Sequence, residues 1–363
     1  MKIVFLSPGF YPKVGGVERH VFEVSTRLIR LGHDVTIITE SDNFNKSHSN
    51  YQHSSKLSDN KAKISNWVVK SSYYATYSVG NIRVISFNFG KKSFFKKFKI
   101  WKLLLGQLNE FKNAEIIHFH DVFIWYLPIK LILPFKNIFI TFHGYEGYPL
   151  SKKNIFIHKI SELLTKGNIC VGDFIKKWYG TKSDFVIYGG VDAQASNKKI
   201  TKSSALFYGR LDDQTGILEY IQAAEKIKKK IPEFKLDIIG EGRLKDKISK
   251  KFKVSSFIKK PEEKLVNYRY AFVSRYLSIL EAMIKKRLVV AHYDNPIKKD
   301  YLLMSPFAKY VVMAHDSDEI VNKVLYFYSN KKEEENKINS AYKWARNQTW
   351  DNVCKVYLKL WSR

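Results

Sequence analysis

Two short segments of the sequence contain the residue types that a phosphorylated ligand requires. Residues 274–283 read Ser-Arg-Tyr-Leu-Ser-Ile-Leu-Glu-Ala-Met, and residues 209–211 read Gly-Arg-Leu. Each segment lies where the pattern predicts a strand running into a helix, so Arg210, Glu281 and a helix N-terminus are expected to face one crevice. A helix N-terminus presents unpaired N–H groups to anions, and an arginine fork binds phosphate oxygens. The predicted chemistry is binding of a phosphorylated ligand whose hydroxyl groups donate to the glutamate.

Two simpler explanations apply to the same residues. Residues 278–281 fit a helix-capping box, in which the serine caps the third helical N–H and the glutamate reaches back. On spacing alone this alternative is favoured, and Arg210 taken singly is typical of an ordinary surface arginine. The β-α-β pattern at the N-terminal end of the chain, taken together with these segments, favours the binding interpretation over the capping box and the surface arginine.

Residues 1–40 have the pattern of one β-α-β unit. An apolar strand over residues 2–6 leads into a loop rich in glycine and proline, and a helix with one apolar face follows until Gly32 ends it. Gly15 and Gly16 stand directly ahead of this helix, where the backbone can come close to a bound anion or sugar. Glycines in such a loop more often serve the turn itself, so the loop alone is a weak signal.

The composition favours an anionic partner. The 363 residues include 62 Lys and Arg against 34 Asp and Glu, a formal net charge of +28. A membrane surface, a nucleic acid or a phosphorylated ligand would suit this charge, and a general lysine bias of composition is the alternative.

The cysteine content and the apolar segments bear on the cellular compartment and on membrane contact. Cys170 and Cys354 are too few for a disulfide framework and have no partner at metal-ligand spacing, so we expect a cytoplasmic setting and no metal site. The most apolar segment, residues 122–134, is too short to span a bilayer, so membrane contact would be peripheral.

The remaining pattern predicts two sheet domains. Residues 41–65 are polar and are expected to form a surface insertion. Strand-like runs in the first half, separated by helical stretches, indicate a doubly wound parallel sheet; they cover residues 82–87, 115–120, 138–142 and 168–171. After a polar linker over residues 194–203, a second set comprises strands at 204–208, 234–239 and 288–291 and a helix at 216–230.

The fold class expected is therefore α/β with two Rossmann-like domains. The N-terminal domain covers residues 1–195 and the C-terminal domain residues 196–345, with a ligand cleft between their strand ends. Residues 346–363 contain a helix that is expected to pack back across the junction. Its one apolar face comprises Trp350, Val353, Tyr357 and Leu360.

Four motifs, in this order and spacing, carry a family resemblance. They are MKIVFLSPGFYPKVGGVERHVFEVSTRLIRLGHDVTIIT at the start, YGGVD before the linker, FYGRLDDQTGILEYIQAA after it, and LSILEAM. With these motifs the chain resembles the family-four retaining glycosyltransferases of GT-B architecture, over nearly its whole length except about residues 41–80.

The resemblance implies transfer of a sugar from a nucleoside diphosphate sugar to a glycan or lipid-linked acceptor. The anomeric configuration would be retained, with no cofactor beyond the co-substrate and no essential divalent metal. Arg210 would clamp the diphosphate, Glu281 would bind the ribose hydroxyls, and His143 would contact the donor sugar, which makes these three the implied catalytic positions. Gly15 and Gly16 would bring N–H groups to the donor, where leaving-group charge needs fixed dipoles.

Further residues are implied by their places in the same motifs. The donor side would include Arg275, Tyr276, Leu277 and Ser278, and the acceptor side Tyr145 and Glu146. His118 and His120 are expected to be satisfied histidines of a buried strand.

Two positions depart from the family pattern. Val273 stands where the family usually has a glutamate, and Thr215 stands near the place of its lysine. Arg275 is a candidate to supply the missing cation. The alternative is a noncatalytic subunit that binds the nucleotide sugar.

A basic aromatic stretch follows residue 90. Residues 91–105 contain six lysines and no acid. An aromatic and leucine stripe at helical spacing begins in this stretch and extends just beyond it; it comprises Phe94, Phe98, Trp101, Leu105 and Leu108. This is the profile of an interfacial amphipathic helix, with Lys96, Lys97, Lys99 and Trp101 as membrane contacts. A core helix with a solvated lysine face explains the stripe equally well.

The combined hypothesis is a cytoplasmic glycosyltransferase that associates peripherally with the inner face of the cell membrane. A nucleic-acid-binding protein is the less favoured alternative, because the basic residues are scattered over both halves and no recognised binding module is present. No nucleic acid partner is therefore expected.

Overall fold

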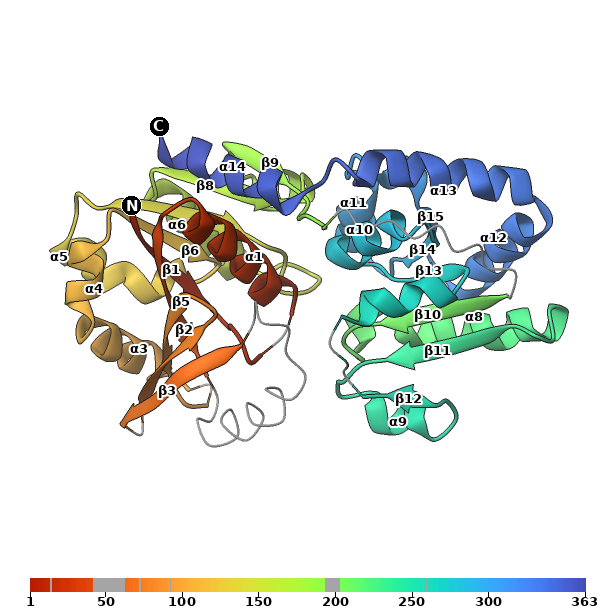
Figure 1. The fold of residues 1–363 in the computed structure, drawn as a ribbon, viewed down its shortest axis with the longest axis horizontal. Coiled ribbons are helices and arrows are strands. Elements are labelled where there is room, and N and C mark those ends of the chain that lie inside the picture. The colour runs from red at the N-terminus through yellow and green to blue at the C-terminus, as the bar shows by residue number, and fades with distance from the viewer. Residues whose placement is uncertain are drawn as a thin grey trace. The chain divides into compact units, whose positions relative to one another are not determined.

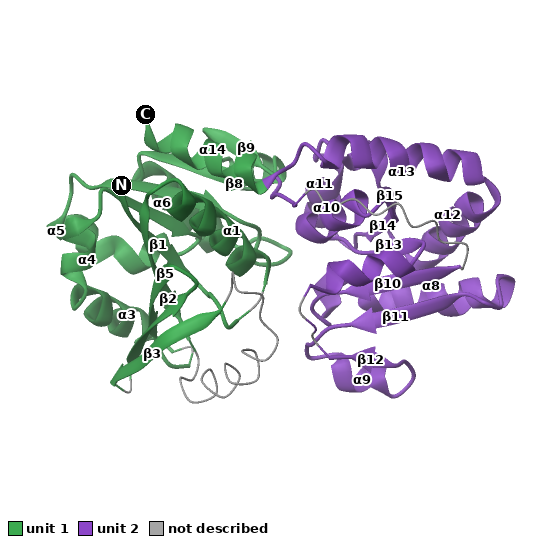
Figure 2. Ribbon diagram, in the orientation of Figure 1, with its two compact units in different colours: residues 1–187, 350–363 green, residues 188–349 purple. Residues whose placement is uncertain are grey.

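The structure is a computed structural model that describes residues 1–13, 15–41, 63–71, 73–91, 93–192, 203–256, 258 and 260–363. It consists of two compact units (Figure 2): residues 1–187 with 350–363 form unit 1, and residues 188–349 form unit 2. Most of the predicted polar insertion and of the predicted linker lies outside the described residues.

Unit 1 is built on a nine-stranded sheet (Figure 1) of order β3-β4-β5-β2-β1-β6-β7-β8-β9. The strands are β1 (Lys2–Ser7), β2 (Asp34–Glu40), β3 (Ile64–Ser71), β4 (Tyr74–Val79), β5 (Ile82–Phe87), β6 (Ile116–His120), β7 (Asn137–Phe142), β8 (Gly167–Val171) and β9 (Phe185–Ile187). The parallel sheet expected from the sequence is present, because β5, β2, β1, β6, β7, β8 and β9 run parallel. Its apolar runs are buried on both faces, as parallel strands require.

Two antiparallel strands extend this sheet at one edge. β3 pairs with β4, and β4 pairs with β5. Residues 80–81 form the two-residue turn between β4 and β5, with Gly80 at φ 58°, a conformation that glycine adopts without steric cost. The sequence pattern had predicted only β5 of these three strands.

The α-helices that the structure describes in unit 1 are α1 (Gly16–Arg30), α3 (Lys96–Leu105), α4 (Leu108–Asn113), α5 (Leu127–Ile132), α6 (Lys152–Leu163), α7 (Phe174–Tyr179) and α14 (Trp350–Trp361). α1 buries its predicted apolar face, including Val21, Val24 and Leu28. The chain returns to unit 1 at α14, which packs against α1. The predicted apolar face of α14 is buried at all four positions.

Unit 2 contains a six-stranded parallel sheet of order β12-β11-β10-β13-β14-β15. Its strands are β10 (Ser204–Tyr208), β11 (Lys235–Ile239), β12 (Val254–Ser255), β13 (Tyr270–Phe272), β14 (Leu288–His292) and β15 (Val312–Ala314). Its helices are α8 (Ile217–Lys230), α9 (Lys245–Ser249), α10 (Tyr276–Ile284), α11 (Pro296–Leu303), α12 (Ser317–Ser329) and α13 (Lys331–Ala345). Within the part of the chain that the structure describes, no helix is both long enough and apolar enough to cross a membrane.

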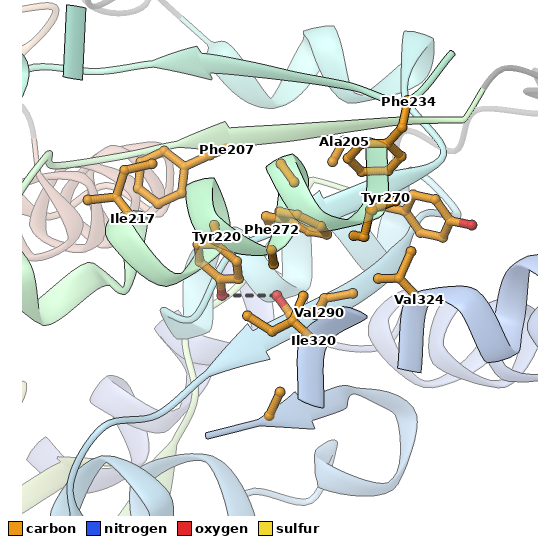
Figure 3. Close-up of a cluster of buried hydrophobic side chains, with 14 of the residues drawn as sticks. Ala205, Phe207, Ile217, Tyr220, Phe234, Tyr270, Phe272, Val290, Ile320 and Val324 are labelled. Carbon is orange, nitrogen blue, oxygen red and sulfur yellow. Dashed lines mark hydrogen bonds between the residues drawn. The ribbon is translucent and has the colours of Figure 1, made fainter. Parts of the chain in front are cut away.

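The core of unit 2 lies between its sheet and the helices α8 and α12. Phe272 and Val290 from the sheet meet Tyr220 from α8 and Ile320 from α12 (Figure 3). Tyr220 is fully buried and donates its hydroxyl to the carbonyl of Val290 at 3.0 Å, so its polar atom is satisfied. This core holds the strand ends of unit 2 in place.

Candidate functional site

Unit 2 brings together the two segments singled out in the sequence. The loop 209–216 follows β10, the segment 273–275 follows β13, and these parallel strands are neighbours in the sheet. Ser274 donates its hydroxyl to the carbonyl of Thr215 at 3.3 Å, and Arg275 Nη2 lies 3.5 Å from Gln214 Oε1. Segments about sixty residues apart therefore lie side by side at the carboxyl ends of the strands, where open α/β sheets bind ligands.

Glu281 is buried on α10 and is held by a residue of β10. The Tyr208 hydroxyl lies 2.7 Å from Glu281 Oε2 and 3.1 Å from the carbonyl of Ser278. Tyr208 was missed in the sequence, although it ends a predicted strand beside Gly209. A carboxylate oriented in this way is prepared to accept from a ligand diol.

The capping-box alternative for Ser278 and Glu281 is wrong. α10 begins at Tyr276 with Arg275 as its N-cap, three residues earlier than that alternative required. Ser278 lies inside the first turn, and its hydroxyl donates back to the carbonyl of Arg275 at 2.9 Å. Glu281 therefore does not take part in a capping box.

The N-terminus of α10 lies at the centre of this arrangement. Tyr276, its first residue, donates its N–H to the hydroxyl of Tyr301 at 2.8 Å. Leu277 and Ser278 follow in the first turn and are half-buried. The N-cap Arg275 has an extended backbone and, among the described residues, no side-chain hydrogen bond that caps the helix. Such an end attracts anions through its N–H groups and the helix dipole.

Exposed arginines lie on the neighbouring loops. Arg210 has 69% of its side chain exposed, and its Nε lies 3.5 Å from Asp212 Oδ2. Arg243, which no sequence motif indicated, forms an ion pair with Asp213. Exposed pairs of this kind contribute about 0–1 kcal/mol, so either guanidinium can change partner when a phosphate binds.

Glycines let two loops of the site pack at backbone distance. A Cβ atom at Gly240 would overlap the carbonyl oxygen of Gly209, and one at Gly242 would overlap the carbonyl oxygen of Leu211. Gly242 also has φ 155°, which disfavours any side chain. The loop carrying Arg243 is thus seated directly on the loop carrying Arg210.

In unit 1, Gly15 is the N-cap of α1 and Gly16 is its first residue. Cβ atoms at Gly9 and Gly15 would both overlap the carboxylate of Glu18, which is only 8% exposed. These glycines therefore make room for an acid in the first turn of α1, where the helix dipole favours negative charge. Glu18 was not singled out in the sequence.

His143 stands at the carboxyl end of β7 in a cluster of buried rings. Its Nε2 lies 2.8 Å from His120 Nδ1, and its backbone N–H donates to Asp121 Oδ1 at 2.9 Å. Asp121 has φ 65°, a conformation uncommon outside glycine that suggests a local constraint. Tyr145 and Glu146 follow His143, and Tyr179 donates to Glu146 Oε2 at 2.5 Å.

The cluster continues beneath β6 and β7 to α14. His118 Nε2 lies 2.8 Å from Thr141 Oγ1, and Trp361 donates to His118 Nδ1 at 3.0 Å. The Tyr357 hydroxyl contacts both Thr141 and His20, at 2.8 and 2.9 Å. As expected, His118 is a satisfied histidine of a buried strand, whereas His120 Nε2 has no hydrogen-bond partner among the described residues.

Burial keeps these histidines neutral near pH 7. It lowers the pKa of His20 to about 3 and the pKa values of His118, His120 and His143 well below the ordinary value. Within the described residues, no three His, Cys, Asp or Glu side chains are grouped so that they could hold a metal ion.

The basic aromatic stretch forms a shorter helix than predicted. α3 ends at Leu105, and Leu108 begins the separate helix α4. α3 buries Ile100 and Leu104, while Phe94 and Phe98 of the predicted stripe are 75% and 48% exposed. The stripe is therefore not the core-facing side of the helix.

The four proposed membrane contacts have different environments. Lys96 pairs with Glu40 at 2.5 Å, so an acid outside the stretch balances it. Trp101 donates to the carbonyl of Ile124 at 2.9 Å and anchors the helix. Lys97 is exposed and lies over the ring of Phe98, and the Lys99 ammonium lies 4.8 Å from the ring centre of Tyr73.

Residues 14–195, half of the chain, match the model of Glycosyltransferase Family 4. The chain belongs to this family. The identification made from the sequence motifs is confirmed, and with it the assignment of the chain as a glycosyltransferase.

Solved structures show the GT-B fold that the motifs predicted. Anabaena Alr3699/HepE, in complex with UDP and glucose, is similar with a TM-score of 0.70 and 14% identity over 100% of this chain and 99% of that one. A glycosyltransferase from Rickettsia africae has a TM-score of 0.68 and 16% identity, covering 99% and 98%. Two Rossmann-like parallel sheets account for this likeness.

A curated relative matches one short segment. The GPI3 subunit of phosphatidylinositol N-acetylglucosaminyltransferase from Saccharomyces cerevisiae is 51% identical over 39 residues. The match spans 11% of this chain and 9% of the relative's length.

Proposed function

We propose that the protein transfers a sugar from a nucleoside diphosphate sugar to a glycan or lipid-linked acceptor, with retention of the anomeric configuration. Unit 2 would bind the donor and unit 1 the acceptor. Family membership supports transfer, and the HepE structure, described as a complex with UDP and glucose, supports this donor class.

The arrangement around α10 is the observation that carries the donor assignment. Arg275 is the N-cap residue of α10, and its guanidinium lies beside Gln214 on the loop that carries Arg210. Glu281, oriented by Tyr208, would accept hydrogen bonds from the ribose hydroxyls. In this reaction the diphosphate leaves with developing negative charge, so fixed guanidinium groups and N–H dipoles stabilise the transition state.

In unit 1 we propose that His143 contacts the donor sugar as a neutral hydrogen-bonding group. The ring is half-buried, and its contact with His120 fixes its orientation. We assign Gly15 and Gly16 to the approach of the donor, and Tyr145 and Glu146 to the acceptor. The hydrogen bond from Tyr179 would hold Glu146 in place.

The departures at Val273 and Thr215 favour a second candidate, a noncatalytic subunit that binds a nucleotide sugar. Val273 is 2% exposed and has no polar side-chain atom to offer a sugar. Thr215 is 7% exposed and uses its hydroxyl on the carbonyl of Asp212 at 2.7 Å. If the protein is an enzyme, the missing cation must come from elsewhere, with Arg275 and Arg243 as candidates.

Turnover of a donor panel separates the two candidates. The protein would be incubated with UDP-, GDP- and ADP-sugars, with and without EDTA, and the products examined by proton NMR. Transfer or slow hydrolysis that releases the retained anomer and survives chelation supports the proposed enzyme. Tight diphosphate binding without turnover favours the subunit, and an inverted product contradicts the proposal.

We propose further that α3 docks unit 1 on an anionic membrane. Phe94, Phe95 and Phe98 are exposed on the same stretch as the exposed Lys97 and Lys102. α5 contacts α3 and ends in two exposed apolar residues, Leu131 and Ile132, and the exposed Phe135 follows it. Exposed aromatic and leucine side chains beside lysines match the boundary between headgroups and acyl chains.

Cosedimentation with liposomes tests this docking. The charge change Lys97→Gln with Lys102→Gln should lower affinity for vesicles of phosphatidylserine and phosphatidylcholine about 30-fold, since each lysine contributes about 1 kcal/mol. Lys228→Gln with Lys229→Gln makes the same change on exposed residues of α8 and should have little effect. If the wild type ignores anionic vesicles even at low salt, the acceptor need not be lipid-linked.

A further inference from the structure

α11 carries a buried lysine that belongs to none of the motifs. Lys298 is only 1% exposed, which is rare for a lysine without a special partner. Its backbone N–H is capped by Asn295 Oδ1 at 2.9 Å, so the first turn of α11 fixes its position. Its ammonium donates to the carbonyl of Ser274 at 2.6 Å and lies 4.6 Å from the ring centre of Tyr301.

These contacts lead to the place where the family lysine is absent. Ser274 precedes Arg275, the N-cap of α10, and its hydroxyl donates to the carbonyl of Thr215. The ammonium of Lys298 is therefore joined through one residue to Thr215, although the two are far apart in sequence. Lys298 of α11 therefore places a basic group near Thr215, where the family usually has a lysine.

α11 braces the same helix end a second time. The Tyr301 hydroxyl accepts the N–H of Tyr276, and the two rings stack with centroids 3.8 Å apart. Lys298 and Tyr301 thus hold the residues on both sides of Arg275. The start of α10 depends on α11 for its position.

The surroundings of Lys298 disfavour its charged form, so an anion nearby would stabilise that form. Burial lowers the pKa of Lys298 well below its usual value, and Arg275 lowers it further, while Asp294 and Asp212 raise it. Burial lowers the pKa of the neighbouring His292, and the charge of Lys298 adds to that lowering. A diphosphate at the N-terminus of α10 would stabilise the ammonium form, because opposite charge nearby favours the charged state.

We propose that Lys298 is a positioning residue of the donor site. Its ammonium, held on the carbonyl of Ser274, sets the start of α10 and supplies beneath it the positive charge for the diphosphate that Thr215 cannot supply. This inference rests on the proposed donor site in unit 2.

Paired ligands separate a role for the charge from a structural role. Calorimetric affinities of wild type, Lys298→Met and Lys298→Arg would be measured for UDP and uridine, GDP and guanosine, and ADP and adenosine. With the pair that the wild type prefers, Lys298→Met should lose at least tenfold in diphosphate affinity and less than about threefold in nucleoside affinity. Lys298→Arg should recover most of the loss. Lys299→Met, the exposed next residue, is the matched control and should bind as the wild type does.

The other outcomes are decisive in different ways. Equal losses for diphosphate and nucleoside, or unchanged diphosphate affinity, overturn the role of Lys298 and leave the donor site intact. A wild type that binds no diphosphate overturns the donor site and this inference with it. If Lys298→Met fails to fold, Lys298→Gln replaces it, because it keeps a hydrogen-bond donor for the carbonyl of Ser274 without the charge. The loss in diphosphate affinity is then compared with the loss in nucleoside affinity in the same way.

Discussion

The two units satisfy their buried polar groups by different means. Unit 1 satisfies its clustered histidines with neutral partners. His118, Thr141, Tyr357 and His20 form one chain of hydrogen bonds, and His120 and His143 form a separate pair. Unit 2 buries charged side chains more deeply. Arg269 and Glu334 form a pair with side chains 10% and 7% exposed, and Lys298 is buried on a carbonyl.

Because of this difference, different conditions should destabilise the two units. A neutral histidine network costs little desolvation near pH 7 but must be protonated in acid, when each imidazolium would be buried. A buried ion pair keeps its charges over a wide pH range but leaves a strongly unfavourable charge if one partner is removed. Unit 1 should therefore be sensitive to pH and unit 2 to single substitutions.

Acidification should have the largest effect, and it should act on unit 1. The folded-state pKa values of the four histidines are lowered, so below about 6.5 the unfolded state binds more protons and stability falls with pH. Each site that stays neutral in the folded state contributes up to about 1.4 kcal/mol per pH unit, so the losses at the four sites add up to a sizeable part of a typical domain stability of about 5–15 kcal/mol.

Tryptophan fluorescence measures this transition, because six of the seven tryptophans lie in unit 1 and Trp344 alone lies in unit 2. His120→Phe removes one titrating ring and should move the transition to lower pH. His315→Gln in unit 2 is the control and should not move it. Acid unfolding of unit 2 ahead of unit 1 would contradict the comparison.

Breaking the buried pair of unit 2 should have the next largest effect. Arg269→Met leaves Glu334 buried without its partner and should cost about 3–5 kcal/mol in the free energy of unfolding. Lys226→Met breaks the exposed pair with Asp318 in the same unit and should cost about 0–1 kcal/mol. Urea unfolding followed by circular dichroism compares the two, and similar costs would show that the Arg269 pair is not special.

Changes at the donor site should be the smallest in stability and the most selective in binding. A hydrogen bond to a charged group contributes about 1.5–3 kcal/mol, so Glu281→Gln should weaken nucleoside diphosphate binding about tenfold or more. Tyr208→Phe removes the hydroxyl that orients Glu281 and should weaken nucleoside diphosphate binding less than Glu281→Gln does. A lowered melting temperature with unchanged affinity would assign Glu281 a structural role only.

Local periodicity was enough to predict most of the elements. The apolar faces of α1 and α14 were predicted because side chains three and four residues apart meet on a helix whatever lies elsewhere. Runs such as those of β6 and β7 were predicted because a buried parallel strand must be apolar on both faces. The hairpin of β3 and β4 was missed, since its polar and half-buried residues resemble a loop.

The sequence predicted the family and most of the strands and helices, and it singled out Arg210, Arg275 and Glu281 as candidate ligand-binding residues, because those signals are local or rest on order and spacing. Only the tertiary structure decided that Tyr208 orients Glu281 and that Lys298 reaches Ser274 beside Thr215. The physical reason is that a buried polar group is satisfied by whatever the packed sheet brings within about 3 Å. The spacing of residues in the sequence does not predict which partner a buried polar group will contact.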